Sequence, residues 1–85
     1  MDSQTKSARK LSEISLNAQC AIQSLLASPE TCQRLREIGL YERTLVRLVA
    51  RTSSQIICEL HNTRIGLHNR VADAILVVGT DTLQN

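Results

Sequence analysis

The chain has 85 residues, of which 42% are apolar, and this is the length and composition of one small globular domain. Tyr41 is its single aromatic residue, which excludes an aromatic cage or a base-stacking platform. Ten Lys and Arg against eight Asp and Glu leave a net charge of +2, too small to indicate a nucleic-acid partner.

Cysteine use and the amino terminus indicate the compartment. Cys20, Cys32 and Cys58 are odd in number and widely spaced, which favours reduced thiols over a disulfide framework. The first residues lack the apolar stretch of a signal peptide. No segment approaches the roughly 20 apolar residues of a membrane span. We therefore expect a cytoplasmic protein without direct membrane insertion.

The two ends are predicted to be tails, and the first regular element is predicted to be a strand. Residues 1–10 are almost entirely polar and are expected to be disordered, and residues 79–85 are expected to form a flexible tail. After Leu11 and Ile14, the first strand is predicted over residues 19–25.

A helix of about ten residues is predicted to begin after Ser28. The Ser28 hydroxyl is a good N-cap, and Pro29 suits the first helical position because it needs no N–H there. Thr31, Leu35 and Ile38 lie on one face of this helix, which is expected to point inward, with Cys32 beside it. Gly39 occupies the position where a left-handed C-terminal cap is expected.

The next segment changes to the period-two pattern of a β-hairpin. Strands are predicted over residues 45–51 and 55–61, joined by a three-residue loop at 52–54. This register places apolar side chains on one face and charged ones on the other. The expected pairs are Val46–Leu60, Leu48–Cys58 and Ala50–Ile56 on the core face, and Arg47–Glu59 and Val49–Ile57 on the outer face.

The rest of the chain completes a mainly β domain with one short helix. Asn62 and Thr63 are predicted to form a turn, followed by a short strand around residues 65–67. Asn69 is expected to cap a single helical turn before a last strand over residues 74–78. Closing these five short strands into a small barrel would remove their exposed edges.

Four short motifs follow one another along the chain. They read Leu-Ser-Glu-Ile at 11–14, Arg-Leu-Arg-Glu-Ile-Gly-Leu at 34–40, Arg-Ile-Gly-Leu at 64–67 and Val-Ala-Asp-Ala-Ile-Leu-Val at 71–77. Their order and spacing resemble the ferrous iron transport protein A family, the FeoA-like domain, over residues 11–78. This resemblance implies an SH3-like five-stranded β-barrel.

The chain departs from the family pattern at several loops. Asn17 and Arg43 lie where the family usually has glycine, before the first strand and after the helix. His68 stands where the family often has arginine, and residues 53–55 replace a common Asp-Pro pair. Asparagine also occupies left-handed turns, so these departures are compatible with the barrel.

The resemblance further implies a small cytosolic accessory protein of ferrous iron transport that acts by protein–protein interaction. Its expected partner is the large membrane ferrous iron transporter, through that protein's cytoplasmic GTP-binding region. Weak self-association is a further option. Two other functions remain open: a metal-responsive regulator module that acts in trans, and a transition-metal-binding carrier.

Catalytic and metal-binding patterns are weak, and no cofactor is expected. His61 and His68 have no nucleophile or carboxylate at a triad spacing, and no glycine-rich phosphate loop exists, so we expect no enzyme. Cys58 and His61 form a Cys-x-x-His pair, but positions i and i+3 of a strand point to opposite faces. We therefore expect no catalytic and no metal-binding residues.

The outer face of the hairpin and the end of the helix form the predicted partner-binding surface. On this face an apolar pair is rimmed by charge, a composition that protein-binding sites share. The alternative is that the segment around Leu11 and Ile14 covers the apolar pair. The predicted contact residues are Arg36, Tyr41, Arg43, Arg47, Val49, Ile57 and Glu59.

Overall fold

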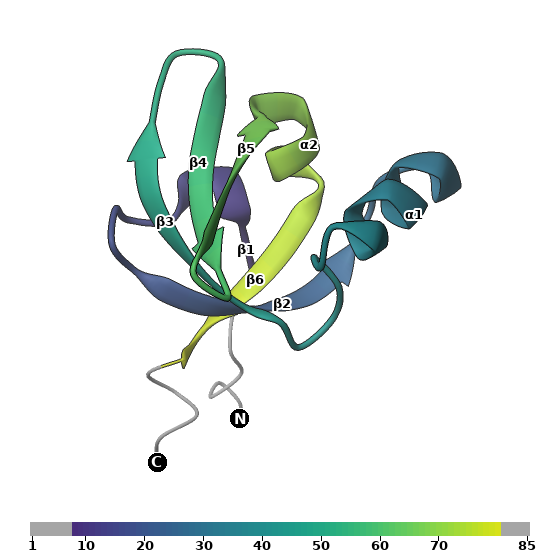
Figure 1. The fold of residues 1–85 in the computed structure, drawn as a ribbon, viewed down its shortest axis with the longest axis horizontal. Coiled ribbons are helices and arrows are strands. Elements are labelled where there is room, and N and C mark those ends of the chain that lie inside the picture. Colours follow the sequence, from purple (N-terminus) through teal and green to yellow (C-terminus); the bar gives the residue numbers. More distant parts are fainter. Residues whose placement is uncertain (1–7, 81–85) are drawn as a thin grey trace.

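The computed structural model describes residues 8–80, which form a curled antiparallel sheet of six strands with two short helices (Figure 1). The elements in chain order are β1 (Arg9–Lys10), the 3-10 helix η1 (Leu11–Glu13), β2 (Gln19–Leu25), α1 (Pro29–Glu37), β3 (Leu45–Arg51), β4 (Gln55–Leu60), β5 (Thr63–His68), α2 (Asn69–Asp73) and β6 (Ile75–Gly79). The strand order in the sheet is β1-β6-β2-β3-β4-β5.

The predicted helix is confirmed, including both of its ends. The Ser28 side chain accepts a hydrogen bond from the Thr31 amide at 3.2 Å, as an N-cap does. At the other end Gly39 adopts a φ of 101°, and the Leu40 amide donates to the Leu35 carbonyl at 2.8 Å. The chain thereby turns back onto the last helical turn, and Leu35 anchors α1 in the core.

The β3–β4 hairpin forms as predicted, but its tip differs. The Thr52 amide donates to the Gln55 carbonyl at 2.8 Å, so the tip has two residues instead of three. A bulge at Val49 absorbs the extra residue. The pairs Arg47–Glu59 and Leu48–Cys58 are confirmed, whereas the predicted pairs Ala50–Ile56 and Val49–Ile57 are wrong, because Ala50 pairs with Ile57 and Arg51 with Ile56.

The core fills the concave side of the curled sheet, and the predicted interior face of the hairpin supplies much of it. Val46, Leu48, Ile56, Cys58 and Leu60 are all buried, whereas Ala50, just past the bulge, is half-buried. Leu11 and Ile14 also belong to this core, together with residues of β2, β5, α2 and β6. No aromatic side chain is among these core residues, as the composition requires.

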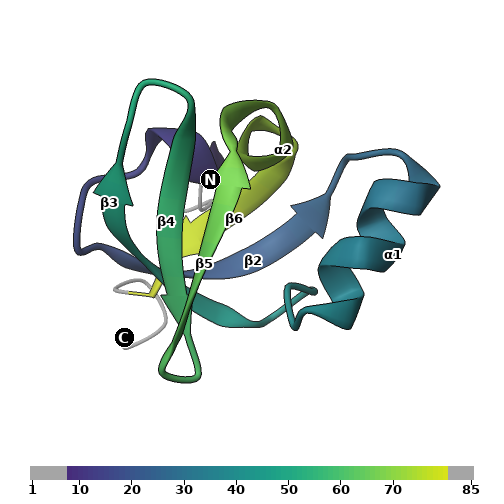
Figure 2. The same ribbon diagram turned by 45° about the horizontal axis from the view of Figure 1, so that its top comes forward.

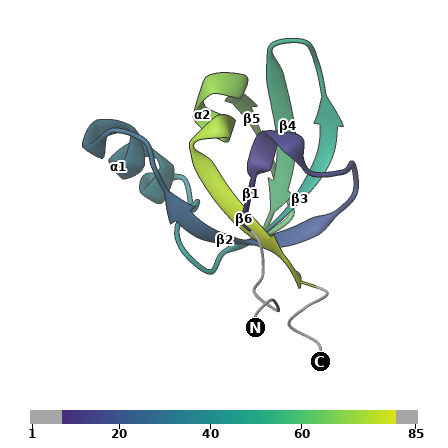
Figure 3. The same ribbon diagram turned by 180° about the vertical axis from the view of Figure 1, so that it is seen from behind.

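The predicted closed five-stranded barrel is wrong, because the sheet formed by residues 8–80 has six strands and does not close. The additional strand, β1, pairs with β6. Within residues 8–80, β5 pairs only with β4 and lies beside it in Figure 2. The two edges of the sheet are therefore β1 and β5. The short η1 lies against α2 instead of extending a strand (Figure 3).

Both predicted tails are shorter than expected where the structure describes them. Arg9 and Lys10 form a strand instead of belonging to a tail. Gly79 ends β6, and the Thr80 hydroxyl donates to the Gln19 carbonyl at 3.3 Å. The remaining residues of both predicted tails, 1–7 and 81–85, lie outside the described part of the chain.

Two smaller corrections concern local turns. The turn between β4 and β5 consists of His61 and Asn62, one residue earlier than predicted, since Leu60 pairs with Thr63. The predicted helical turn exists as α2, but its N-cap is His68, whose Nδ1 accepts from the Arg70 amide at 3.3 Å.

Candidate functional site

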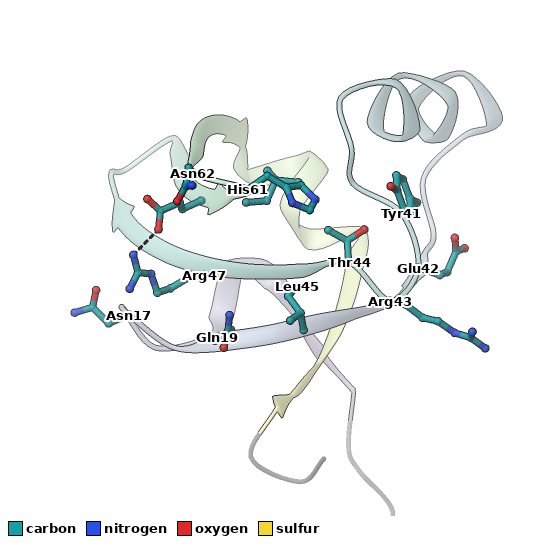
Figure 4. A pocket seen from close by; sticks show the side chains of 12 residues that line it. Asn17, Gln19, Tyr41, Glu42, Arg43, Thr44, Leu45, Arg47, His61 and Asn62 are labelled. Atoms are coloured by element: carbon teal, nitrogen blue, oxygen red, sulfur yellow. Dashed lines mark hydrogen bonds and ion pairs between the residues drawn. The ribbon is translucent and has the colours of Figure 1, made fainter. Parts of the chain in front are cut away.

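An open groove with a volume of about 740 Å³ lies where the β4–β5 turn faces the loop between α1 and β3 (Figure 4). Five stretches of chain line it: Asn17, Gln19 of β2, the loop 41–44, the first half of β3, and residues 59–62. We call it the polar groove, because most of these residues carry polar or charged side chains.

Every non-glycine residue with a positive φ in the range 8–80 lines the polar groove. These residues are Asn17 (φ 70°), Arg43 (76°), His61 (51°) and Asn62 (65°). Asparagine tolerates the left-handed region, but a residue such as arginine pays about 1–2 kcal/mol there. Such conformations gather where the surrounding structure enforces them, which is often at functional sites.

The conformation of Arg43 follows from the turn that contains it. The Thr44 amide donates to the Tyr41 carbonyl at 3.0 Å, which makes residues 41–44 a four-residue turn with Arg43 in its third place. A positive φ at this place defines a type II turn, which favours Gly or Asn. The Arg43 amide also donates to the Ile22 carbonyl at 2.8 Å, so β2 holds the turn in position.

Neighbouring hydrogen bonds fix the same loop from its other side. The Thr44 carbonyl accepts from the Ile22 amide at 3.0 Å, and the Thr44 hydroxyl donates to the Gly39 carbonyl at 3.2 Å. Thr44 is the buried polar residue of the described chain, with 7% of its surface exposed. Its bonds join the end of α1 to the start of β3.

The opposite wall of the groove is the two-residue turn of His61 and Asn62. Both have a positive φ, which is the requirement of the type I′ turn that suits a two-residue hairpin. Beside it, the Asn17 amide donates to the Leu48 carbonyl at 2.6 Å and so fixes the chain before β2. Each left-handed residue of the groove is therefore held by a turn or by a backbone hydrogen bond.

Ion pairs occupy most of the charged groups near the groove. Arg36 binds Glu42 through two contacts of 3.1 and 3.2 Å, and Arg47 binds Glu59 across the hairpin. The Glu42 backbone amide and the Arg36 guanidinium hold the pKa of the Glu42 carboxyl below its usual value. Arg43 is exposed and makes no ion pair with any residue from 8 to 80.

Four of the seven predicted contact residues meet at the polar groove: Tyr41, Arg43, Arg47 and Glu59. Arg36 lies outside it but reaches its edge by binding Glu42. Val49 and Ile57 do not line it and are half-buried.

The segment around Leu11 and Ile14, the alternative cover for Val49 and Ile57, contributes its apolar residues to the core. Leu11 and Ile14 are buried in the core, and neither Val49 nor Ile57 belongs to that cluster. Ile57 instead pairs with Gly66 of β5, where its Cδ1 would lie 3.4 Å from an added Cβ.

Eight residues that line the polar groove were not predicted from the sequence: Asn17, Gln19, Glu42, Thr44, Leu45, Leu60, His61 and Asn62. Asn17 carried a usable signal, because it occupies a position where the related family usually has glycine. Asn62 was assigned to a turn, but nothing in its neighbourhood pointed to a site. His61 carried no such signal, because it continued the alternating pattern of the strand predicted over residues 55–61.

The thiols and histidines do not assemble into a metal centre within residues 8–80, where no three His, Cys, Asp or Glu side chains converge. Burial raises the pKa of Cys20 to about 12 and that of Cys58 to about 11. Cys58 lies in the core, whereas His61 lies in an exposed turn, so the Cys-x-x-His pair is divided between interior and surface. Across the same residues, neither helix has the length and apolar character needed to cross a membrane.

Comparison with known proteins gives one family. The model of the FeoA domain matches residues 9–78. No curated protein matches the chain.

Several solved structures share the fold. An iron uptake regulatory protein (FeoA) matches with a TM-score of 0.78 and 18% identity over 85% of this chain and 97% of its own. The iron(II) transport protein A from Clostridium thermocellum matches with a TM-score of 0.79 and 27% identity, over 85% of this chain and 46% of its own. A manganese-dependent transcriptional repressor matches with a TM-score of 0.81 and 23% identity over 88% of this chain. The match covers 43% of the repressor, so this chain spans less than half of its length.

Proposed function

This chain belongs to the FeoA domain family, and from that premise we propose that it is a cytoplasmic accessory protein of ferrous iron transport that binds another protein. The proposed partner is the cytoplasmic GTP-binding region of the large membrane ferrous iron transporter. Solved relatives described as an iron uptake regulatory protein and as iron(II) transport protein A support this pathway. The proposal includes no catalytic step.

The observation that carries the proposal is the gathering of left-handed residues around the polar groove. Arg43 occupies a turn position that glycine would fill at lower conformational cost. Its guanidinium extends away from the ribbon and has no acidic partner within residues 8–80 (Figure 4). A side chain presented in this way supports a role in contact with another molecule.

The chemistry of the groove suits a polar surface that carries negative charge. Tyr41 is 45% exposed and offers a hydroxyl on an apolar ring, and such residues often anchor interfaces. Glu42 and Glu59 are already paired with arginines, which leaves Arg43 as the uncompensated charge. An acidic patch on the partner would complement it.

The test is the affinity of the chain for the purified transporter in lipid nanodiscs. We expect Tyr41→Ala and Arg43→Glu each to weaken binding about tenfold or more, about 1.4 kcal/mol, without lowering the melting temperature. Arg70→Glu on α2 is the matched control and should bind as the native chain does. Native affinity in both groove variants would remove the polar groove from the interface.

The likeness to the manganese-dependent repressor supports a second candidate, a regulator module that acts in trans. In that case the chain would bind a DNA-binding regulator and change its affinity for its operator. A gel-shift assay with the regulator and increasing amounts of this chain separates the two functions. A shift in operator affinity, together with no binding to the transporter, would favour the regulator.

The remaining alternative, a transition-metal carrier, is tested by titration. Ferrous iron and zinc would be added to the reduced chain while thiol accessibility is followed. The burial of Cys20 and Cys58 favours no binding below about 1 mM metal. Tight binding that protects the thiols would support the carrier instead.

A further inference from the structure

A second groove, with a volume of about 340 Å³, lies between α1 and the edge strand β5 and shares no residue with the polar groove. Its lining includes Leu35, Leu67 and the half-buried Val71, which pack in or against the core. Ile38, the C-cap residue of α1, is 47% exposed and also lines it, as does Gly66 of β5. We call it the edge groove.

The backbone of β5 presents unpaired hydrogen-bonding groups along this groove. Within residues 8–80, β5 pairs with β4 alone, and the two-residue turn makes Leu60 and Thr63 a hydrogen-bonded pair. By the alternation of an antiparallel ladder, Ile65 and Leu67 then bond to β4. The N–H and C=O groups of Arg64 and Gly66 therefore point away from β4, along the free edge.

Gly66 makes this edge accessible. It has no side chain, so nothing from this residue shields the strand from a second backbone. The free edge is also next to apolar surface, since Gly66 and Leu67 line the same groove as Ile38. An exposed strand edge beside an apolar groove is the arrangement to which extended peptides add as a further strand.

The charged residues around the edge groove indicate which kind of peptide segment it can bind. Arg34 lines it from α1 and makes no ion pair within residues 8–80. Arg64 is 68% exposed, and its nearest acidic contact is a 3.9 Å one to Glu59. Glu37 is the acidic residue of the lining and balances Arg34 there, so the excess positive charge comes from Arg64, which lies beside the groove on β5.

We propose that the edge groove binds an extended segment of a partner protein in which apolar and acidic residues alternate, added as a strand beside β5. Its backbone pairs with Arg64 and Gly66. One set of its side chains packs towards Ile38 and Val71, and its carboxylates lie near Arg34 and Arg64. This binding is separate from the contact proposed at the polar groove.

Amide hydrogen exchange tests the free edge directly. In the free chain the amides of Arg64 and Gly66 should exchange rapidly, whereas those of Ile65 and Leu67 should be protected. A protected Gly66 amide in the dilute free chain would overturn the proposal. Protection that rises with protein concentration would also overturn it, because the occupant would then be a second copy of the chain.

A displayed library of random short peptides, selected against the full chain, identifies occupants. We expect selected peptides to be acidic and apolar and to protect the Gly66 amide on binding. Methylation of alternate peptide amides, which removes the ladder donors, should abolish binding. A library that yields no binder, or only binders that leave Gly66 unprotected, would contradict the proposal.

Matched variants locate the site. Ile38→Lys should weaken the selected peptides about tenfold or more, whereas Leu26→Lys, at a residue that is 63% exposed and outside the groove, should not. Arg34→Glu should likewise weaken binding, and Arg70→Glu should leave it unchanged. If the two lysine variants, or the two glutamate variants, changed peptide affinity equally, the edge groove would be excluded as the binding site.

Discussion

Arg43 holds the third place of the turn 41–44 with a φ of 76°, where a Cβ is unfavourable. Replacement by glycine removes this cost of about 1–2 kcal/mol but adds about 0.5–1 kcal/mol of backbone entropy to the unfolded state. We therefore expect Arg43→Gly to leave stability unchanged or to raise it by up to about 1 kcal/mol, measured by urea unfolding.

The control for this change is Arg34→Gly in α1. The same substitution in an exposed helical position should lower the free energy of unfolding by about 1 kcal/mol, because glycine is a poor helix former. Equal losses in the two variants would show that Arg43 carries no conformational cost.

The buried thiols predict a loss of stability in alkaline solution. Cys20 and Cys58 have pKa values of about 12 and 11 in the fold, against 9.0 for an ordinary thiol. Above pH 9 the unfolded chain releases protons that the folded chain keeps, so the free energy of unfolding falls as the pH rises towards 11. The slope is at most about 1.4 kcal/mol per pH unit for each thiol.

Urea unfolding between pH 8 and about 11 measures this slope, with the double variant Cys20→Ala/Cys58→Ala as the comparison. The variant should be less stable at pH 8 because it has lost core volume, but its stability should fall less steeply with pH. An unchanged slope would mean that the two thiols ionise as readily in the fold as in the unfolded chain.

Among the elements, both ends of α1 were predictable because their signals are local, whereas the inward position predicted for Ile38 is wrong, since this residue is 47% exposed. Ser28 supplies an acceptor and Gly39 supplies a left-handed residue, and each acts within a few positions of the helix end. The β3–β4 hairpin was predictable in its strands but not in its tip. The hairpin could have a two-residue tip with a bulge at Val49 or a three-residue loop without a bulge. Both leave nearly the same alternation of buried residues, so the sequence pattern does not distinguish the two tips.

The end of α1 offers an element-scale prediction. Gly39→Ala should lower the free energy of unfolding by about 1–2 kcal/mol, because φ is 101° and the new Cβ would lie 3.3 Å from Leu60 Cδ1. Gly79→Ala, whose Cβ meets no atom within 4 Å, is the control and should change stability little. Thermal unfolding followed by circular dichroism compares the two, and a similar melting temperature for both variants would contradict the account of the helix end.

At the scale of the whole molecule, the alternation identified the core but could not reveal whether the sheet closes. Closure depends on which edges meet, and β1 is a two-residue strand in a polar segment that carries no periodic signal. For a related reason, the sequence predicted only some of the residues that line the polar groove. Tyr41 and Arg43 stood out as exposed groups after a helix, but a site assembled from five separate stretches of chain needs the fold to bring them together.

Arg51 connects the amino-terminal segment to the hairpin. Its Nη2 donates to the carbonyls of Ser12 and Ile14 at 2.9 and 2.6 Å. Arg51→Met should therefore cost about 1–3 kcal/mol and increase the exchange of amides in η1, because two charge-assisted hydrogen bonds are lost. Arg34→Met on the exposed face of α1 should cost less than about 0.5 kcal/mol, and an equal cost would show that Arg51 does not hold η1 in place.

The most direct test of the polar groove as the partner site is the affinity of the Arg43→Gly variant for the transporter in nanodiscs, measured beside its stability. If the left-handed arginine serves binding, the variant should be at least as stable as the native chain and bind about tenfold more weakly or worse. A variant that binds with native affinity would contradict this account.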